Sequence, residues 1–325
     1  MGTVQLTEEQ RSMEIDRGEA LREVAPTRRT LSNSRLWTFA LVLAIAVANA
    51  GSGVAPAENA PAASPLAIPA RDWAVDCAKN EESVLQHPGS YLRYRLHQVD
   101  EKGDRMRDQI ETPDGSVARL IQHDGRPLST EEDSAESARL NELMAAPEAF
   151  AHHTRHEQSD NKMEVDLLRL MPDAMLWSYA AGQPQLANQS AGVPALVVLD
   201  FKPNPKWSAP TLESEMLTGI EGRVWIDPQT RHMVHLQADV FRAVNIGWGF
   251  VAHLYPGGTV TAHQVNAGGQ RWILNHIDEK VTLRALLVKN VKQRMTLDAA
   301  DFQPVPAMNY RQAIKILLEA PVATH

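Results

Sequence analysis

The residue types best suited to chemistry gather in one polar stretch, Ala151–Glu157, which reads AHHTRHE. On a helix, His153 and His156 would lie one turn apart and could both reach one metal ion, with Glu157 beside them. However, the sequence has no H-E-x-x-H pattern and no second His or Asp cluster to complete such a site. The alternative is a polar helix end, where cationic histidine is stabilised by the helix dipole. We therefore expect no metal site and no cofactor, and keep a metal-dependent hydrolase only as an alternative.

Nucleophiles and acids point to no catalytic centre either. Cys77 is the single cysteine, so it forms no internal disulfide, and we expect a small, partly buried hydrophobe because no basic partner lies near it. No G-x-S-x-G pattern is present. Asp227, Asp278 and Glu279 fall at predicted turns or strand ends, where solvated carboxylates are ordinary. The sequence thus predicts no catalytic residue and no enzyme.

An apolar segment, Val244–Gly258, is rich in glycine and aromatic residues (VNIGWGFVAHLYPGG). A phosphate-binding loop would need a glycine-rich turn that leads into a helix, with a Lys or Ser/Thr for the phosphate, but the flanks of this segment are strand-like. Two interpretations remain. The segment is a wide turn whose Trp248, Phe250 and Leu254 close one end of the core, or it is an apolar rim at the mouth of a ligand cavity.

The overall charge excludes one class of partner. The formal net charge is −8, and the first 50 residues hold six arginines and six acidic residues, so the whole excess lies in the remainder. A mildly acidic domain binds nucleic acid poorly, because phosphate contacts need clustered Lys and Arg.

The N-terminal region predicts export. Leu36–Ala50 is uncharged and apolar, follows several arginines, and ends in the small-x-small pattern of a signal cleavage site. We expect cleavage after about Ala50 and a periplasmic or secreted protein. The alternative is an N-terminal membrane anchor over Leu36–Pro56, about the length that a span needs. Met13 is an alternative start to Met1.

The rest of the chain divides by composition. Residues 1–50 form the N-terminal tail and signal segment, and residues 51–70 form an Ala/Pro-rich spacer that cannot bury a core. Residues 71–325 are expected to be one β domain with a helical insertion at about 129–171.

Alternation and turn signals predict the elements of this domain. Strands are expected over Tyr91–His97, Met106–Thr112, Ser116–His123, Met175–Ala180, Ala195–Lys202, Gly222–Ile226, His232–Phe241, Thr259–Val265, Gln270–Asp278 and, as one bent strand or two, Val281–Leu297. Helices are expected over Ser129–Met144, Pro147–His156, Met163–Leu170 and Asn309–Glu319, with a helical turn at Leu212–Leu217. Short turns imply antiparallel pairing. The fold class is therefore mainly β (α+β), an antiparallel half-barrel whose concave face is covered by the inserted helices.

The C-terminal half resembles an uncharacterised family of secreted proteins common in acidobacteria. The matching stretches are Asp200–Pro205, Gly222–Asp227, Asn245–Phe250, His253-Leu254 with Gly257-Gly258, and Asp301–Pro306. The hairpin Gly222–Val234 is similar to that of the lipoprotein carrier (LolA/LolB-like) superfamily. This resemblance implies a half-barrel in which helices close an apolar cavity, and it implies no catalytic residues.

These observations lead to one functional expectation and its alternatives. We expect an envelope or periplasmic protein that binds a lipid-like or acyl ligand, or a lipid-modified one, in an apolar cavity. The expected wall residues are Val234, Leu236, Val240, Trp272 and Leu274, together with Trp248 and Phe250 from the loop. The alternative is a sensor or interaction module that binds an envelope protein partner.

Overall fold

The structure is a computed structural model that describes residues 68–87, 89–183, 195–247, 252–269, 271–285 and 289–320. The chain divides into two compact units, Met1–Trp37 and Thr38–His325, and all described residues belong to the second. The predicted export segment Leu36–Ala50 lies outside the described residues, and so does nearly all of the spacer. Among the described helices, none is both long and apolar enough to cross a membrane.

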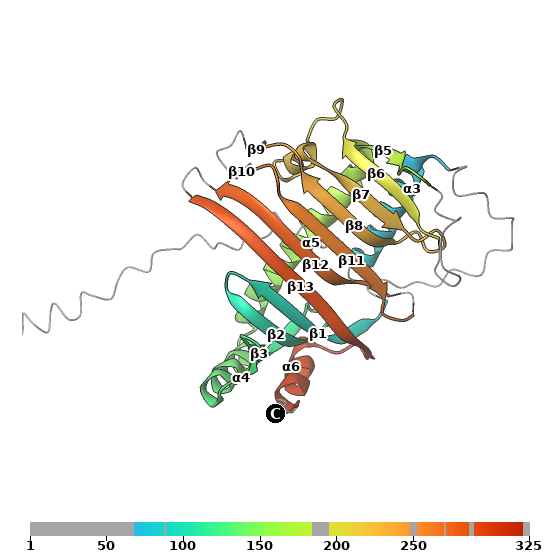
Figure 1. Ribbon diagram of the computed structural model, residues 1–325. Helices are drawn as coiled ribbons and strands as arrows, with labels where there is room; N and C mark the ends of the chain where they lie inside the picture. The colour runs from blue at the N-terminus through green and yellow to red at the C-terminus, as the bar shows by residue number, and fades with distance from the viewer. Residues whose placement is uncertain are drawn as a thin grey trace, which may run out of the picture. The chain divides into compact units, whose positions relative to one another are not determined.

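One open antiparallel sheet dominates the described part of the chain (Figure 1). Its strand order is β4-β3-β2-β1-β13-β12-β11-β8-β7-β6-β5, with β10 pairing both β12 and β9. The two edge strands do not pair with each other, so the sheet is not closed. The strands are β1 Tyr91–Asp100, β2 Gly103–Ile110, β3 Val117–His123, β4 Arg126–Pro127, β5 Met175–Tyr179, β6 Val197–Pro203, β7 Ile220–Ile226, β8 Met233–Val240, β9 Val244–Ile246, β10 Ala252–Leu254, β11 Thr259–Asn266, β12 Trp272–Ala285 and β13 Lys289–Val305. The predicted mainly β class with an open antiparallel sheet is confirmed.

Of the two alternatives for Val281–Leu297, one bent strand or two, the structure has two strands: β12 continues to Ala285 and β13 returns beside it, with Val281 opposite Gln293. The apolar segment after β8 contains two short strands, β9 and β10, rather than a plain wide turn.

The β2–β3 connection shows why its turn needs glycine. Gly115 has φ +123, and a Cβ added there would lie 2.6 Å from Cγ2 of Thr154 on a neighbouring helix. Any side chain would therefore meet both a backbone restriction and a clash. The Pro113–Gly115 turn was predicted from sequence, but the close approach of the helix is a tertiary feature.

The helices are α3 Ala70–Gln86, α4 Thr130–Ala145, α5 Pro147–Ala174 and α6 Tyr310–Glu319, with a 3-10 helix, η3, at Glu213–Gly219. The capping box predicted at Ser129 and Glu132 is present in both directions. Helix α3 was not predicted from the sequence. The two helices expected over Pro147–His156 and Met163–Leu170 are one continuous helix, because no Gly or Pro interrupts residues 157–162 and Pro172 falls only in the last turn.

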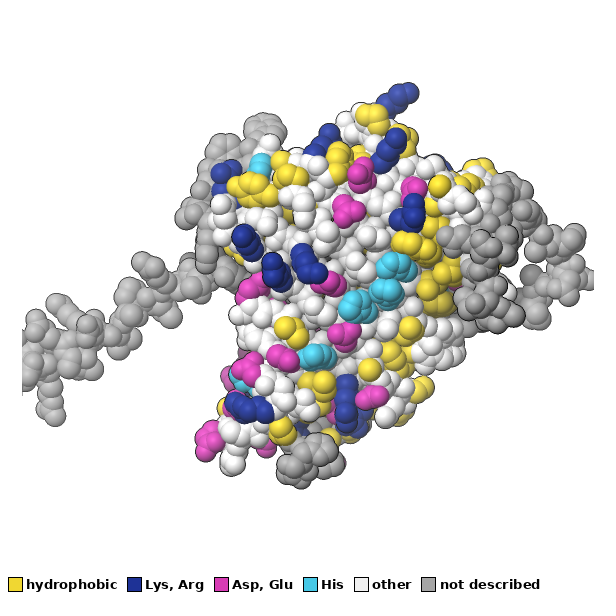
Figure 2. All heavy atoms as spheres, in the orientation of Figure 1, with side chains coloured by type: hydrophobic (Ala, Val, Ile, Leu, Met, Phe, Trp, Pro, Cys, Tyr) yellow, Lys and Arg dark blue, Asp and Glu magenta, His cyan; other side chains and the backbone are white. Residues whose placement is uncertain are grey.

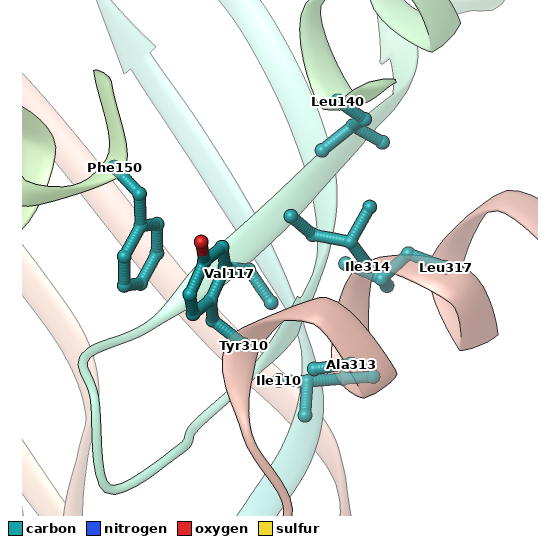
Figure 3. Packing of buried hydrophobic residues seen from close by; sticks show 8 residues of the cluster. All are labelled: Ile110, Val117, Leu140, Phe150, Tyr310, Ala313, Ile314 and Leu317. Carbon is teal, nitrogen blue, oxygen red and sulfur yellow. The ribbon is translucent and has the colours of Figure 1, made fainter. Parts of the chain in front are cut away.

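The helices form two groups. Helix α4 packs against β3 and α6, whereas α3 and α5 pack against each other and contact β5. Figure 3 shows the core of the first group, in which the rings of Phe150 and Tyr310 stack 3.8 Å apart between their centres. Thus α5 begins at this cluster and ends beside α3, and α5 rather than α4 forms the cover at the β5 end of the sheet (Figure 1).

Candidate functional site

A small apolar cavity lies between α3, α5 and the sheet. Its volume is about 70 Å³. It is lined by apolar side chains and two carboxyl groups: Ala74, Cys77, Ala78, Glu81, Glu164, Leu167, Leu168, Met171, Trp177, Leu217, Val224, Ile226, Met233 and Leu236. Space of this size is well below the roughly 300–1,000 Å³ of typical small-molecule pockets.

Helical periodicity explains which residues reach this cavity. On α3 the lining positions Ala74, Ala78 and Glu81 recur at spacings of four and three, so they share one face. On α5 Glu164 and Leu168 lie one turn apart on the lining face. The two alanines of α3 leave space because their side chains stop at Cβ. The cavity therefore follows from small residues on one helix that face larger residues on the other elements.

Glu81 attaches α3 to the sheet. Its carboxylate accepts hydrogen bonds from the backbone N–H of Met233 at 2.9 Å, from Nε2 of Gln264 at 3.4 Å, and makes a 3.1 Å contact with Nδ1 of His232. The side chain is only 2% exposed. A buried carboxylate with this many partners is stabilised in place, so Glu81 has a structural role at one end of the cavity.

Glu164 faces the same cavity without such partners. The residue is 2% exposed, and its Oε1 has no hydrogen-bond partner among the described residues. Burial, and secondarily the charge of Glu81, raise the pKa of Glu164 well above its usual range. The group therefore keeps its proton to a higher pH than an exposed glutamate. It presents an acid donor and acceptor to an otherwise apolar space.

Cys77 lies in the wall of the cavity as a buried thiol. Burial raises the pKa of this thiol well above its usual range, with the nearby charge of Glu81 as a secondary cause. The thiolate is the nucleophilic form of cysteine. The environment of Cys77 therefore favours a packing role over a reactive one.

The structure brings only part of the predicted wall to this cavity. Leu236 lines the cavity. Val240 is also buried and lies four residues further along β8, on the same face. Trp272 and Leu274 are buried on β12, outside the cavity lining, and the indole of Trp272 stacks on His232 at 5.2 Å between ring centres. Val234 is half-buried where the register between β7 and β8 shifts. Trp248 and Phe250 lie outside the described residues.

Two residues of the histidine-rich stretch of α5, His153 and Glu157, contact the β2–β3 turn. His153 makes a 3.1 Å contact through Nε2 with the carbonyl of Ser116, and the carboxylate of Glu157 accepts hydrogen bonds from the Ser116 N–H and hydroxyl. These bonds join α5 to the β2–β3 turn. Within the described ranges, no three His, Cys, Asp or Glu side chains are already grouped to hold a metal ion.

One sequence expectation about acidic residues is wrong. Glu279 was placed at a strand end with a solvated carboxylate, but it lies inside β12, is 0% exposed, and neither carboxylate oxygen has a hydrogen-bond partner in the described part of the chain. Burial, and then the charge of Glu101, raise the pKa of Glu279 to about 8. The error arose because β12 is longer than the predicted strand and places Glu279 on the buried face with Val281.

Sequence reasoning missed both acids of the cavity. Glu81 and Glu164 lie on different helices, far apart in the chain, and only the packing of α3 on α5 brings them to one cavity. A signal did exist for Glu164. It shares a helical face with Leu167, Leu168 and Met171, so an acid interrupts an apolar stripe.

Comparisons with protein families, with curated proteins and with solved structures find no match for this chain.

Proposed function

We propose that this protein binds a lipid-like ligand, with its acyl chain between the α3–α5 cover and the sheet. The observation that carries the proposal is an apolar cavity into which Glu164 faces with an unpartnered, buried carboxyl oxygen. A buried polar atom without a partner is unfavourable by about 1–3 kcal/mol. A hydroxyl, amide or amine in the polar end of a ligand would satisfy this atom.

Apolar contacts would supply most of the binding free energy. Burial of acyl surface contributes roughly 0.8 kcal/mol per CH₂ group. The side chains that would contact the chain include Leu167, Met171, Val224 and Leu236, which come from a helix and two strands. The LolA/LolB-like resemblance of the Gly222–Val234 hairpin supports the same use of the fold.

The proposal requires the cover to move. A cavity of about 70 Å³ is smaller than the engineered one of about 150 Å³ that holds benzene. An acyl chain therefore enters only when α3 or α5 shifts away from the sheet. The hydrogen bonds of Glu81 and the ion pair between Arg231 and Asp76, 2.5 Å long, hold α3 in its closed position.

Native mass spectrometry of the full chain, followed by lipid extraction, tests the proposal. We expect a copurified lipid and saturable binding of a fluorescent fatty-acid analogue. The variant Ala78→Leu fills the cavity and should lower the affinity for the analogue at least tenfold. The matched control Ala151→Leu makes the same change at an exposed position of α5, where affinity should not change.

The paired variants also separate the cavity from the apolar N-terminal segment. Lipid that is held by Leu36–Ala50 would be retained equally by both variants. Absence of any lipid and of any analogue binding, or equal binding by Ala78→Leu and the parent chain, would reject the proposal.

A further inference from the structure

A row of histidines crosses the sheet on the face opposite the cavity. His235 on β8 is directly opposite His263 on β11, which is directly opposite His276 on β12. The ring centres are 4.1 Å apart for the first pair and 5.5 Å apart for the second. The row continues to Trp225 on β7 and Asp298 on β13. Figure 2 shows histidine side chains grouped on the sheet face turned toward the viewer, with α3 and α5 behind the sheet in Figure 1.

We propose that His235, His263 and His276 form a binding site for one divalent late transition-metal ion, such as zinc. Neutral imidazole is a preferred ligand of Zn²⁺, Cu²⁺ and Ni²⁺. The three rings come from three adjacent strands, so an ion bound there would join β8, β11 and β12 across their exposed face. Water would complete the coordination of an open, surface-exposed ion.

The hydrogen bonds of the two outer histidines orient their rings for this role. His235 directs Nδ1 at the carbonyl of Ala262, 3.0 Å away, and His276 directs Nδ1 at the carboxylate of Asp298, 2.7 Å away. A carbonyl and a carboxylate can only accept, so Nδ1 carries the proton in the neutral form of each ring, and that form leaves the lone pair on Nε2. Metal-bound histidines almost always show this arrangement, in which the second ring nitrogen donates to a carbonyl or carboxylate.

The ring spacing fits shared coordination of one ion. With Zn–N bonds of about 2.0–2.1 Å and a tetrahedral angle, two imidazoles on one zinc ion have ring centres roughly 5 Å apart. The two observed separations, 4.1 and 5.5 Å, lie on either side of this value. As placed, the three side chains are not grouped closely enough to hold an ion. Binding therefore requires the exposed ring of His263 to rotate from its present contacts with the rings of His235 and His276.

Titration of the untagged full chain with Zn²⁺ by isothermal calorimetry at pH 7.5 tests the site. We expect saturable binding of one ion. His263→Gln should weaken the binding at least tenfold, and Asp298→Asn, which removes only the partner of His276, should weaken it about tenfold. His153→Gln is the matched control in the other histidine cluster and should leave the affinity unchanged.

Thermal denaturation of each variant without metal checks that it remains folded, which His263→Gln should, because this side chain is exposed. The proposal is overturned if the parent chain shows no saturable Zn²⁺ binding. It is also overturned if His153→Gln, rather than His263→Gln, removes the binding. Either result leaves the lipid proposal untouched, because the two sites lie on opposite faces of the sheet.

Discussion

Buried carboxyl groups of this protein differ mainly in their partners. Glu81 has three hydrogen-bonding neighbours, and Glu111 pairs with Arg271 at 2.9 Å. Glu164 and Glu279 are as deeply buried, yet each has at least one carboxyl oxygen without a partner among the described residues. The first pair is held in place by its partners, whereas the unpaired oxygens of the second pair favour the protonated form of each acid, and burial raises the pKa of both Glu164 and Glu279.

Glu279 provides the clearest pH prediction. Because its pKa is raised to about 8 in the folded protein, folding is most favourable when the group is protonated. Its contribution is fully present below the unfolded pKa of about 4.3, and it is lost progressively as the pH rises to about 8. We expect the free energy of unfolding to fall by several kcal/mol between pH 5 and pH 9, as measured by urea denaturation.

The variant Glu279→Gln should reduce this pH dependence, since it removes the titrating group. Asp278→Asn is the matched control, because its side chain is on the opposite, partly exposed face of β12 beside Lys280. Equal pH dependence in the parent chain and in Glu279→Gln would contradict the assignment.

At the scale of elements, the helices that were predicted are those with a capping residue at the first turn and a recognisable apolar face in the sequence. Helix α4 begins at its capping box, and α6 begins at Asn309, whose side chain accepts a hydrogen bond from the backbone N–H of Gln312. Helix α3 has no side-chain cap and was missed. Helix α5 was divided in two because its polar middle, residues 157–162, does not show an apolar face.

Packing of helix α6 against the sheet should contribute to the stability of the fold. Leu317 is 0% exposed in the cluster with Ile110, Val117 and Leu140 (Figure 3). We expect Leu317→Ala to lower the free energy of unfolding by about 2–5 kcal/mol, because it leaves a cavity in a closely packed cluster. Urea denaturation followed by circular dichroism measures the change. Ile316→Ala, at a neighbouring position that is 36% exposed, should change stability by less than about 1 kcal/mol.

A comparable loss in Ile316→Ala would contradict this account, because alanine is the better helix former at both positions and only packing in the cluster distinguishes Leu317 from Ile316.

At the scale of the whole described unit, one buried ion pair joins parts of the chain that are far apart in sequence. Glu111 follows β2 and Arg271 precedes β12, and their side chains are 7% and 1% exposed. Glu111 also accepts the backbone N–H of Leu92 on β1 at 3.0 Å. The pair therefore connects the N-terminal strands to the β11–β12 hairpin.

Removing only Arg271 from this pair should lower the free energy of unfolding more than removing the charges of both Arg271 and Glu111. Arg271→Met leaves Glu111 buried and unpaired, so we expect a loss of about 3–5 kcal/mol in the free energy of unfolding. The double variant Arg271→Met with Glu111→Gln keeps an acceptor for Leu92 without a charge, and should recover more than about 1 kcal/mol of this loss. A double-mutant cycle by urea denaturation measures both values, and a double variant less stable than Arg271→Met would contradict this account.

The fold class was predictable because it depends on local features of the chain, namely the alternation of apolar side chains and the residues at turns. Alternation in β8 and a strong turn at Pro113–Gly115 already indicate antiparallel pairing, and a pattern of period two needs no knowledge of the partner strand. The sequence by itself therefore determined most strands, the capping box at Ser129 and the final helix.

The sites were decided only by the tertiary structure. Glu81 and Glu164 reach one cavity through the packing of two helices, and His235, His263 and His276 form a row through strand order and register. Neither arrangement has a local signature, because contacts between residues far apart in the chain depend on register and helix docking. These are set by the burial of whole apolar faces rather than by the residues that meet at the site.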